Sequence, residues 1–197
     1  LYNNTSWPNP VVVKLENVEW INQKHNALDK QEKADGWQLL FDSESTDPWR
    51  SLGTADFPDS GWVVRDGELV NESGGVGDII TKERYSDFDF SFEWKLDLKG
   101  GNSGVKYFVI EELSGDSKSG LGLEYQILDD TGHEWMLEGK MQPNDFHTVG
   151  ALYELYPPNN KKVFPLGVYN TSRIVSKDNH VEHWLNGIKV VEFERGS

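Results

Sequence analysis

The chain has 197 residues, of which 37% are hydrophobic and 12% aromatic, enough for one folded domain with a sizeable core and too aromatic for a disordered chain. Its formal net charge of -14 repels phosphate backbones and anionic lipid surfaces, and no apolar run reaches the length of a membrane span, so we expect neither nucleic acid binding nor membrane insertion. Because it has no cysteine, disulfides, thiolate metal sites and cysteine nucleophiles are excluded.

Residues 1–35 are predicted to form an N-terminal extension. Its first ten residues are rich in Pro and Asn and are expected to be irregular, whereas Val11–Val13 is expected to form a short edge strand. Asp29, with Glu32 three residues later, has the pattern of a capping box. We therefore predict one short N-terminal helix that ends at Gly36.

From residue 36 onward the pattern changes to short apolar runs separated by turn residues. Asp66-Gly67 and Asn186-Gly187 each lie between two such runs, which is typical of tight β-hairpins. Tyr85–Leu96 alternates most regularly, with large apolar residues on one face that must be buried against another sheet. Helical periodicity is nearly absent, and the frequent turns predict an all-β fold: a two-sheet antiparallel sandwich or jelly roll spanning 36–197.

The most informative polar pattern lies between Gly100 and Asp130. The predicted strand of residues 122–128 places Glu124, Gln126 and Leu128 on one face and Leu123, Tyr125 and Ile127 on the other. We favour ligand binding or catalysis over a merely solvated face for this carboxylate and amide. The glycines around Asn102 and Ser103 allow a tight turn in which short polar groups approach a ligand closely.

Several other polar side chains have two open interpretations. Glu93 and Lys95 form either a cross-strand salt bridge of little energetic value or a polar pair facing a ligand. Lys106 is either a buried cation near the site or an exposed edge charge. Arg173 either pairs with a strand carboxylate or orients a sugar. His133 closely follows Asp129 and Asp130, so it is either a solvated loop residue or a metal ligand or base.

Two residues near the C-terminus are assigned to the core. His183 alternates with Val181 and Leu185, which favours a hydrogen-bonded core histidine, and Trp184 is expected to fill core rather than stack on a sugar. Gly-rich phosphate loops, HExxH and Gly-x-Ser-x-Gly motifs are absent from the sequence. Glu93 and Glu124 remain a possible acid pair for ordinary glycoside hydrolysis, since sequence does not give their separation.

Five segments, taken in order, resemble the 3-keto-disaccharide hydrolase family. They are GNSGVKYF, LEYQILDD followed by His133, GALYELYPP, YNTSRIV and VEHWLNGIKVVEFERGS. The resemblance implies a concanavalin A-like (laminin-G-like) jelly roll and a bacterial protein exported to the periplasm or cell surface. It also implies that relatives continue past the ERGS motif, so we expect this chain to lack the last strands of the domain.

The resemblance implies cleavage of glycosides that carry a ketone at carbon 3, by proton abstraction and elimination or hydrolysis. Glu124 or His133 would act as base, and Lys106 or a divalent cation would stabilise the enolate oxygen. A calcium or transition-metal ion would be held by Glu124, Asp129 and His133. The expected contacts to a glycoside or oligosaccharide are Glu93, Lys95, Asn102, Ser103, Gln126 and Arg173.

Two hypotheses without catalysis remain open. The same fold binds sugars without chemistry in many lectin-like proteins, so a carbohydrate-binding module is the alternative, and the high acidity would suit bound calcium. An adhesion or assembly domain is a third hypothesis, which predicts a large exposed aromatic patch.

Overall fold

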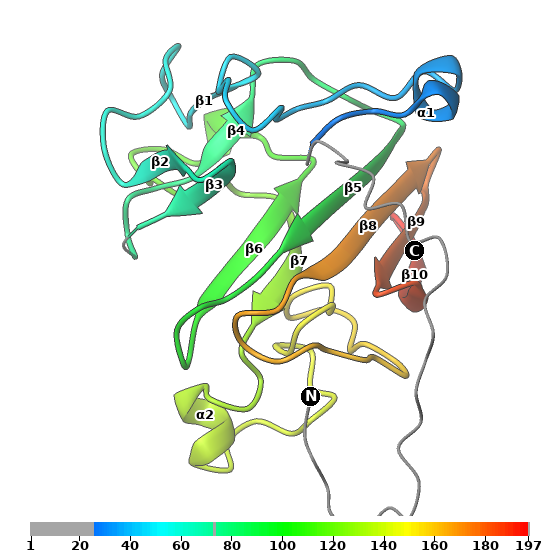
Figure 1. Ribbon diagram of the computed structural model, residues 1–197. Coiled ribbons are helices and arrows are strands. Elements are labelled where there is room, and N and C mark those ends of the chain that lie inside the picture. Colours follow the sequence, from blue (N-terminus) through cyan, green and yellow to red (C-terminus); the bar gives the residue numbers. More distant parts are fainter. Residues whose placement is uncertain (1–25, 73, 197) are drawn as a thin grey trace, which may run out of the picture.

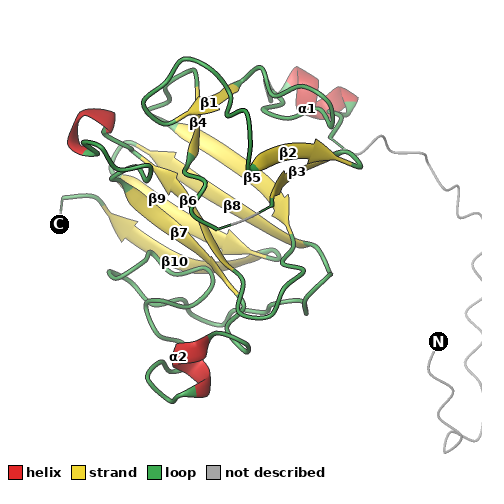
Figure 2. Cartoon of the chain, turned by 90° about the vertical axis from the view of Figure 1, so that its left-hand side faces the viewer, coloured by secondary structure: helices red, strands yellow, loops and turns green. Residues whose placement is uncertain are grey.

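The structure is a computed structural model that describes residues 26–72 and 74–196. Within these residues the protein is built mainly of antiparallel strands, which confirms the all-β prediction (Figures 1 and 2). The strands are β1 (Trp49–Ser51), β2 (Trp62–Arg65), β3 (Glu68–Asn71), β4 (Ile79–Thr81), β5 (Phe88–Trp94), β6 (Asn102–Tyr107), β7 (Leu123–Leu128), β8 (Asn170–Lys177), β9 (His180–Leu185) and β10 (Ile188–Glu194). The jelly-roll connectivity stays a prediction.

The helical elements are short. Helix α1 (Lys30–Ala34) begins with the predicted capping box, in which Asp29 accepts from the Glu32 backbone and Glu32 accepts from the Asp29 backbone. Helix α2 (Glu134–Leu137) lies at the opposite end of the molecule, and a 3-10 helix (Glu111–Leu113) follows β6. None of the helices within the described residues combines the length and apolar character needed to cross a membrane. The predicted strand Val11–Val13 lies outside the described residues.

Two sheets enclose the core. One has the strand order β10-β9-β8-β5 and the other pairs β6 with β7, while β1-β4 and β2-β3 form two smaller sheets. The inner faces of the two larger sheets supply the most deeply buried side chains. Fully buried members of this core are Tyr125, Val149, Ile174, Val181, His183 and Leu185.

Several local predictions are confirmed. Asp66-Gly67 and Asn186-Gly187 join β2 to β3 and β9 to β10 as tight hairpins, with positive φ at all four residues. The burial of β5 alternates strictly along its seven residues, as the sequence pattern required. His183 is a core histidine whose Nε2 lies 2.9 Å from the Tyr107 hydroxyl and whose Nδ1 lies 3.2 Å from the Gly150 carbonyl oxygen.

The prediction for Trp184 is wrong. Along β9, Val181, His183 and Leu185 point into the core, and the period-2 geometry of a strand turns Trp184 to the outer face. There its indole nitrogen donates to Glu182 Oε2 at 2.8 Å. His183 and Leu185, the residues on either side of Trp184, both face the core, so strand alternation requires Trp184 to face outward.

The apolar run Val149–Tyr156 forms no regular strand but lies along the free edge of β7. The backbone of Gly150 donates to the Gln126 carbonyl, that of Gln126 donates to the Ala151 carbonyl, and that of Tyr153 donates to the Glu124 carbonyl. A bridge between Tyr125 and Leu152 continues the pairing. Strand β7 therefore has backbone partners on both edges, and this segment extends the polar face that carries Glu124.

Candidate active site on the β6–β7 face

The face of β6 and β7 that points away from the core gathers four of the predicted site residues. Their antiparallel register sets Lys106 opposite Glu124 and Gly104 opposite Gln126, with Asn102 one pair further along. Alternation within each strand turns all of these positions to the same side. The predicted alignment of Glu124 and Gln126 on one face is therefore observed, and Asn102 and Lys106 join them.

Gly104 makes room for the Glu124 side chain. A Cβ atom at this position would lie 2.8 Å from Glu124 Cδ and closer still to a carboxylate oxygen. The Glu124 carboxylate thus lies over the β6 backbone at Gly104, which is in register with Gln126. The glycine of the GNSG sequence serves this close approach of a side chain, and its backbone does not need a positive φ.

The environment of Glu124 disfavours its charged form. Burial of the half-buried carboxyl raises its pKa, attraction by Lys106 lowers it, and repulsion by Asp78 raises it, so that the net shift is upward. Lys106 is itself held in place, because its ammonium group lies 3.2 Å from Asp78 Oδ2 and also contacts the Ser119 hydroxyl. The site therefore combines a partly desolvated acid with a fixed neighbouring cation.

Two adjoining cavities lie on this face, and Glu124 lines the first of them. The first, of about 340 Å³, is lined by Lys106, Glu124 and Tyr153 together with residues 120–123 and 154–155. The second, of about 250 Å³, lies toward α2. Its lining consists of Asn102, Gln126, Leu128, His133, Glu134, Trp135, Met141, His147 and Tyr153. Tyr153 lines both cavities, so they adjoin, and each has room for about one small polar ring system.

Hydrogen bonds fix the floor of the second cavity. The Gln126 amide donates to the His147 carbonyl at 3.3 Å and, more weakly, to Asn102 Oδ1 at 3.5 Å. His133 is the N-cap of α2, and its Nδ1 accepts from the Trp135 backbone at 3.3 Å. The predicted binding residues Asn102 and Gln126 and the predicted base His133 thus line one cavity.

Sequence analysis missed a histidine–carboxylate pair in this cavity. The His147 Nδ1–H donates to Asp145 Oδ1 at 2.7 Å, and the rings of Trp135 and Tyr153 pack edge-on against the imidazole at 5.6 and 5.2 Å. The carboxylate and the two rings fix the orientation and tautomer of the imidazole. In the sequence, the pair is visible only as the Asp-x-His spacing of Asp145 and His147, just before the GALY run. Because this segment is irregular, no strand periodicity shows on which face of the protein the two side chains lie.

Other predicted site residues are not brought to this face. Arg173 pairs with Asp89 on the outer side of the four-stranded sheet, and Glu93 is exposed on the same side. Lys95 pairs with Glu68 at 2.7 Å. Ser103 lies in register with Ile127, on the side of β6 opposite to Asn102 and Lys106. Their contacts to a sugar remain sequence-based predictions.

The predicted metal ligands are not gathered either. The Asp129 carboxylate accepts from the Gly100 backbone at 2.9 Å and from the Thr131 hydroxyl at 2.8 Å. Burial raises the pKa of Asp129, but the hydrogen bonds from Gly100, Thr131 and Gly132 outweigh it and lower the pKa. Among the described residues, the group of three potential ligands within 4.8 Å lies elsewhere, on β9 and β10. Glu124, Asp129 and His133 therefore do not fit a metal in this arrangement.

Comparison with known proteins assigns this chain to a family. Residues 36–197 match the family described as the 3-keto-alpha-glucoside-1,2-lyase-like domain. A 3-keto-disaccharide hydrolase of Bacteroides thetaiotaomicron is 29% identical over 177 residues, which cover 81% of this chain. The chain spans 59% of the length of that relative. The resemblance stated from the sequence motifs is thereby confirmed.

Solved structures of Parabacteroides distasonis proteins are also similar. One, described as a "putative glycosyl hydrolase", superimposes with a TM-score of 0.74 at 36% identity, covering 87% of this chain and 78% of that one. A second with the same description has a TM-score of 0.58 at 28% identity, covering 74% and 72% of the two chains. These likenesses support an all-β sandwich of antiparallel sheets for this chain, as in the two proteins described as putative glycosyl hydrolases.

Proposed function

Because this chain belongs to the 3-keto-alpha-glucoside-1,2-lyase-like domain family, we propose that its β6–β7 face cleaves glycosides that carry a ketone at carbon 3. The observation that carries this proposal is Glu124: a half-buried carboxyl with a raised pKa, in the lining of the first cavity and near a fixed cation. A general base works best when its pKa lies near the operating pH, and partial desolvation moves a glutamate in that direction.

The proposed reaction begins with proton abstraction. A ketone at carbon 3 acidifies the hydrogen on carbon 2, and Glu124 removes that proton to leave an enolate. The enolate oxygen then re-forms the ketone, a double bond forms between carbons 1 and 2, and the oxygen-linked group leaves carbon 1 with the electrons of its bond. When water adds to carbon 1 and Glu124 returns its proton to carbon 2, the net reaction is hydrolysis; without that step it is elimination.

Lys106 and His147 act on the negative charges that develop on the two oxygen atoms of the reaction. Lys106, held by Asp78, stabilises the enolate oxygen in the first cavity. His147, which Asp145 orients through a hydrogen bond of 2.7 Å, donates a proton to the departing oxygen in the second cavity. Gln126 and Asn102 bind hydroxyl groups, and Trp135, which is 39% exposed at this cavity, offers an apolar face to a sugar ring. No step needs a metal.

The test is a turnover assay with a chromogenic glucoside and its 3-keto derivative, with and without chelator. We expect release from the keto form alone, and a loss of about 10²–10⁴-fold for Glu124→Gln. Glu93→Gln is the matched control, since it makes the same change on an exposed strand position of the other sheet. Equal turnover by Glu124→Gln and the wild type would remove Glu124 from the mechanism.

The other outcomes separate the competing functions. Release from both substrates would indicate an ordinary two-carboxylate glycosidase. No release from either, together with saturable sugar binding, would favour the non-catalytic carbohydrate-binding module, which the same cavities and Trp135 also suit. Loss of turnover with chelator would show that a metal acts in the site after all.

A further inference from the structure

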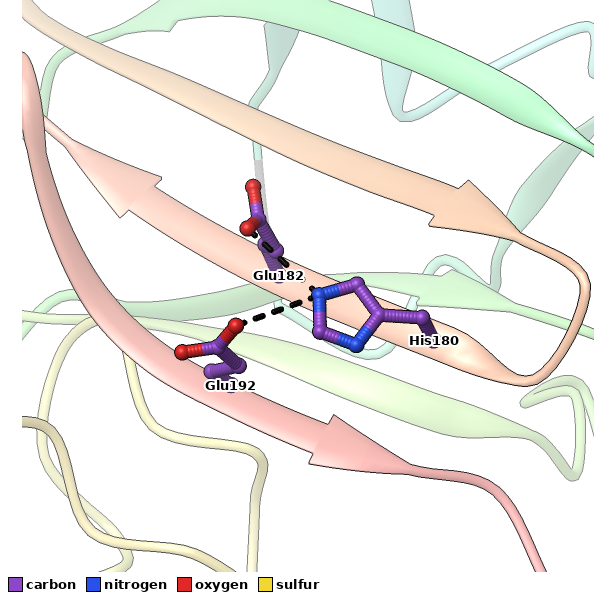
Figure 3. Close-up of side chains that lie close together, drawn as sticks. All are labelled: His180, Glu182 and Glu192. Atoms are coloured by element: carbon purple, nitrogen blue, oxygen red, sulfur yellow. Dashed lines mark hydrogen bonds and ion pairs between the residues drawn. The ribbon is translucent and has the colours of Figure 1, made fainter.

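A second cluster of chemically active side chains lies on the outer face of the four-stranded sheet, on the opposite side of the core from Glu124. His180 and Glu182 alternate outward along β9, and β10 sets Glu192 directly opposite Glu182. Figure 3 shows the His180 ring reaching between the two carboxylates. Two carboxylates facing each other across a strand pair repel, so this position favours a bound cation.

We propose that His180, Glu182 and Glu192 form a site for a divalent cation of the zinc type. An imidazole with two carboxylates is a donor set that suits Zn²⁺ and similar first-row ions, whereas calcium and magnesium sites use oxygen donors alone. The site is separate from the sugar cavities and independent of the proposed function. It would join β9 to β10 beyond their backbone hydrogen bonds and leave a coordination position open to water or to another ligand.

The separations of the donor atoms fit such an ion. His180 Nε2 lies 3.2 Å from Glu192 Oε1 and 3.5 Å from Glu182 Oε1, and the three ligand atoms all lie within 4.8 Å of one another. A tetrahedral ion with ligands at about 2.0–2.2 Å holds its donor atoms about 3.3–3.6 Å apart. The two distances from the imidazole are close to this spacing, so little movement of the strands would be needed.

Groups outside the three ligands orient them. His180 Nδ1 lies 2.8 Å from Glu194 Oε1, which directs Nε2 toward Glu182 and Glu192. The Trp184 indole donates to Glu182 Oε2, which leaves Oε1 directed at the imidazole. Histidine ligands of metal sites nearly always donate their second ring N–H to such a carboxylate, and ligating carboxylates are themselves hydrogen-bonded. An arbitrary surface ion-pair cluster has no need of this second layer.

Lys189 is the natural competitor for the cation. Its ammonium group lies 3.0 Å from Glu182 Oε1 and 2.9 Å from Glu192 Oε2, so it neutralises the two carboxylates when no metal is bound. Arg173 and Lys177 of β8 add positive charge nearby, since Arg173 acts on Glu182 and Lys177 is in register with His180. Metal binding must displace Lys189, whose side chain is 34% exposed and flexible enough to move.

This competition gives the site a sharp test. Zn²⁺ alone would be titrated into the full chain by calorimetry, and thermal stability would be measured with and without the ion. We expect saturable binding of one ion per chain, abolished by His180→Asn and by Glu192→Gln. Glu194→Gln should weaken binding about tenfold by releasing the imidazole. Lys189→Met should strengthen it, whereas an adventitious surface ion would not respond to removal of that ammonium group.

A matched control keeps the outcome decisive. His133→Asn removes a histidine that lines the second cavity, outside the cluster, and it should not change the zinc affinity. Binding that persists in His180→Asn, binding that Lys189→Met leaves unchanged, or no saturable binding to either the wild type or Lys189→Met would overturn the site. Turnover of a keto-glycoside is not used in this test, so its result stands apart from the fate of the proposed function.

Discussion

The β6–β7 face and the outer face of β9–β10 are both polar faces of antiparallel strands, yet they treat charge in opposite ways. On the first, burial of Glu124 outweighs the attraction of Lys106, and the pKa of the carboxyl rises. On the second, burial of Glu182 is outweighed by hydrogen bonds from Lys189, Trp184 and His180, and the pKa falls. One face disfavours the charged form of its acid, Glu124, whereas the other favours the charged form of Glu182.

The difference teaches that alternating polar residues alone do not identify a reactive site. What distinguishes the Glu124 face is a charged group that is partly removed from water without full compensation by partners. On the outer face, hydrogen bonds and an ion pair with Lys189 compensate the charge of Glu182. The same contrast recurs within β9, where His183 faces the core and His180 faces outward.

After the loss of the Glu124 carboxylate itself, the largest expected effect comes from Gly104→Ala, which would move Glu124 without changing its chemistry. The added methyl group would occupy the place of the Glu124 carboxyl, the mobile end of a long side chain, and the backbone at this glycine has no positive φ. We expect a folded protein with about 100-fold lower kcat/KM on a 3-keto-glycoside, because a misplaced catalytic group loses its alignment. Circular dichroism and steady-state kinetics would measure both.

Gly74→Ala is the matched control for this substitution. A Cβ atom there meets nothing within 4 Å, and the residue has no positive φ, so the change should leave turnover intact. If Gly104→Ala also kept full turnover, the position of the Glu124 carboxyl would not matter, and the contrast between the two faces would lose its functional meaning.

The two histidines of β9 should give opposite pH dependences of stability. Burial lowers the pKa of His183 to about 4, although hydrogen bonds that the imidazole makes to the backbone at Gly150 and Ala151 oppose the shift. The unfolded chain binds this proton near pH 6.5 and the folded chain does not, so His183 destabilises the fold as the pH falls from about 6.5 to about 4. The loss between about pH 7 and pH 5 should be about 2 kcal/mol.

His183→Gln and His180→Gln separate the two effects. The pKa of His180 is raised, mainly by the hydrogen bond to Glu194, so its contribution is present below about pH 6.5 and is lost as the pH rises through the folded pKa. Urea unfolding at several pH values should show a flatter acid limb for His183→Gln and a steeper one for His180→Gln. Parallel shifts of both variants at every pH would contradict the assignment of inner and outer faces.

The sequence predicted well wherever period-2 alternation determined the answer. The alternation of β5, the two hairpins, the core position of His183 and the common face of Glu124 and Gln126 all follow from local pattern and turn chemistry. Alternation does not say to which sheet a face belongs. Glu93 therefore looked equivalent to Glu124 in sequence although it lies on the other side of the core.

Two further features depended on contacts that no local pattern encodes. His147 comes from an irregular segment, and only the folded chain sets it beside Trp135 and Tyr153. The role of Gly104 likewise appears only once Glu124 is seen to cross the neighbouring strand. Sequence pattern thus determined which side chains share a strand face, whereas the walls of the site came from loops packed against it.

The smallest expected effect tests whether the outer face of β8 contributes to substrate binding. Arg173 donates to both oxygens of Asp89, with its Nε 2.6 Å from Asp89 Oδ1, and its side chain is 44% exposed. An exposed pair of this kind contributes less than about 1 kcal/mol, so Arg173→Ala should lower stability only slightly, and less so at high salt. Because Asp89 already occupies the guanidinium and the four-stranded sheet separates it from Glu124, KM for a keto-glycoside should not change, whereas Asn102→Ala should raise it. A raised KM for Arg173→Ala would restore the sequence-based prediction that this arginine orients the sugar, and would mean that the two faces cooperate in one site.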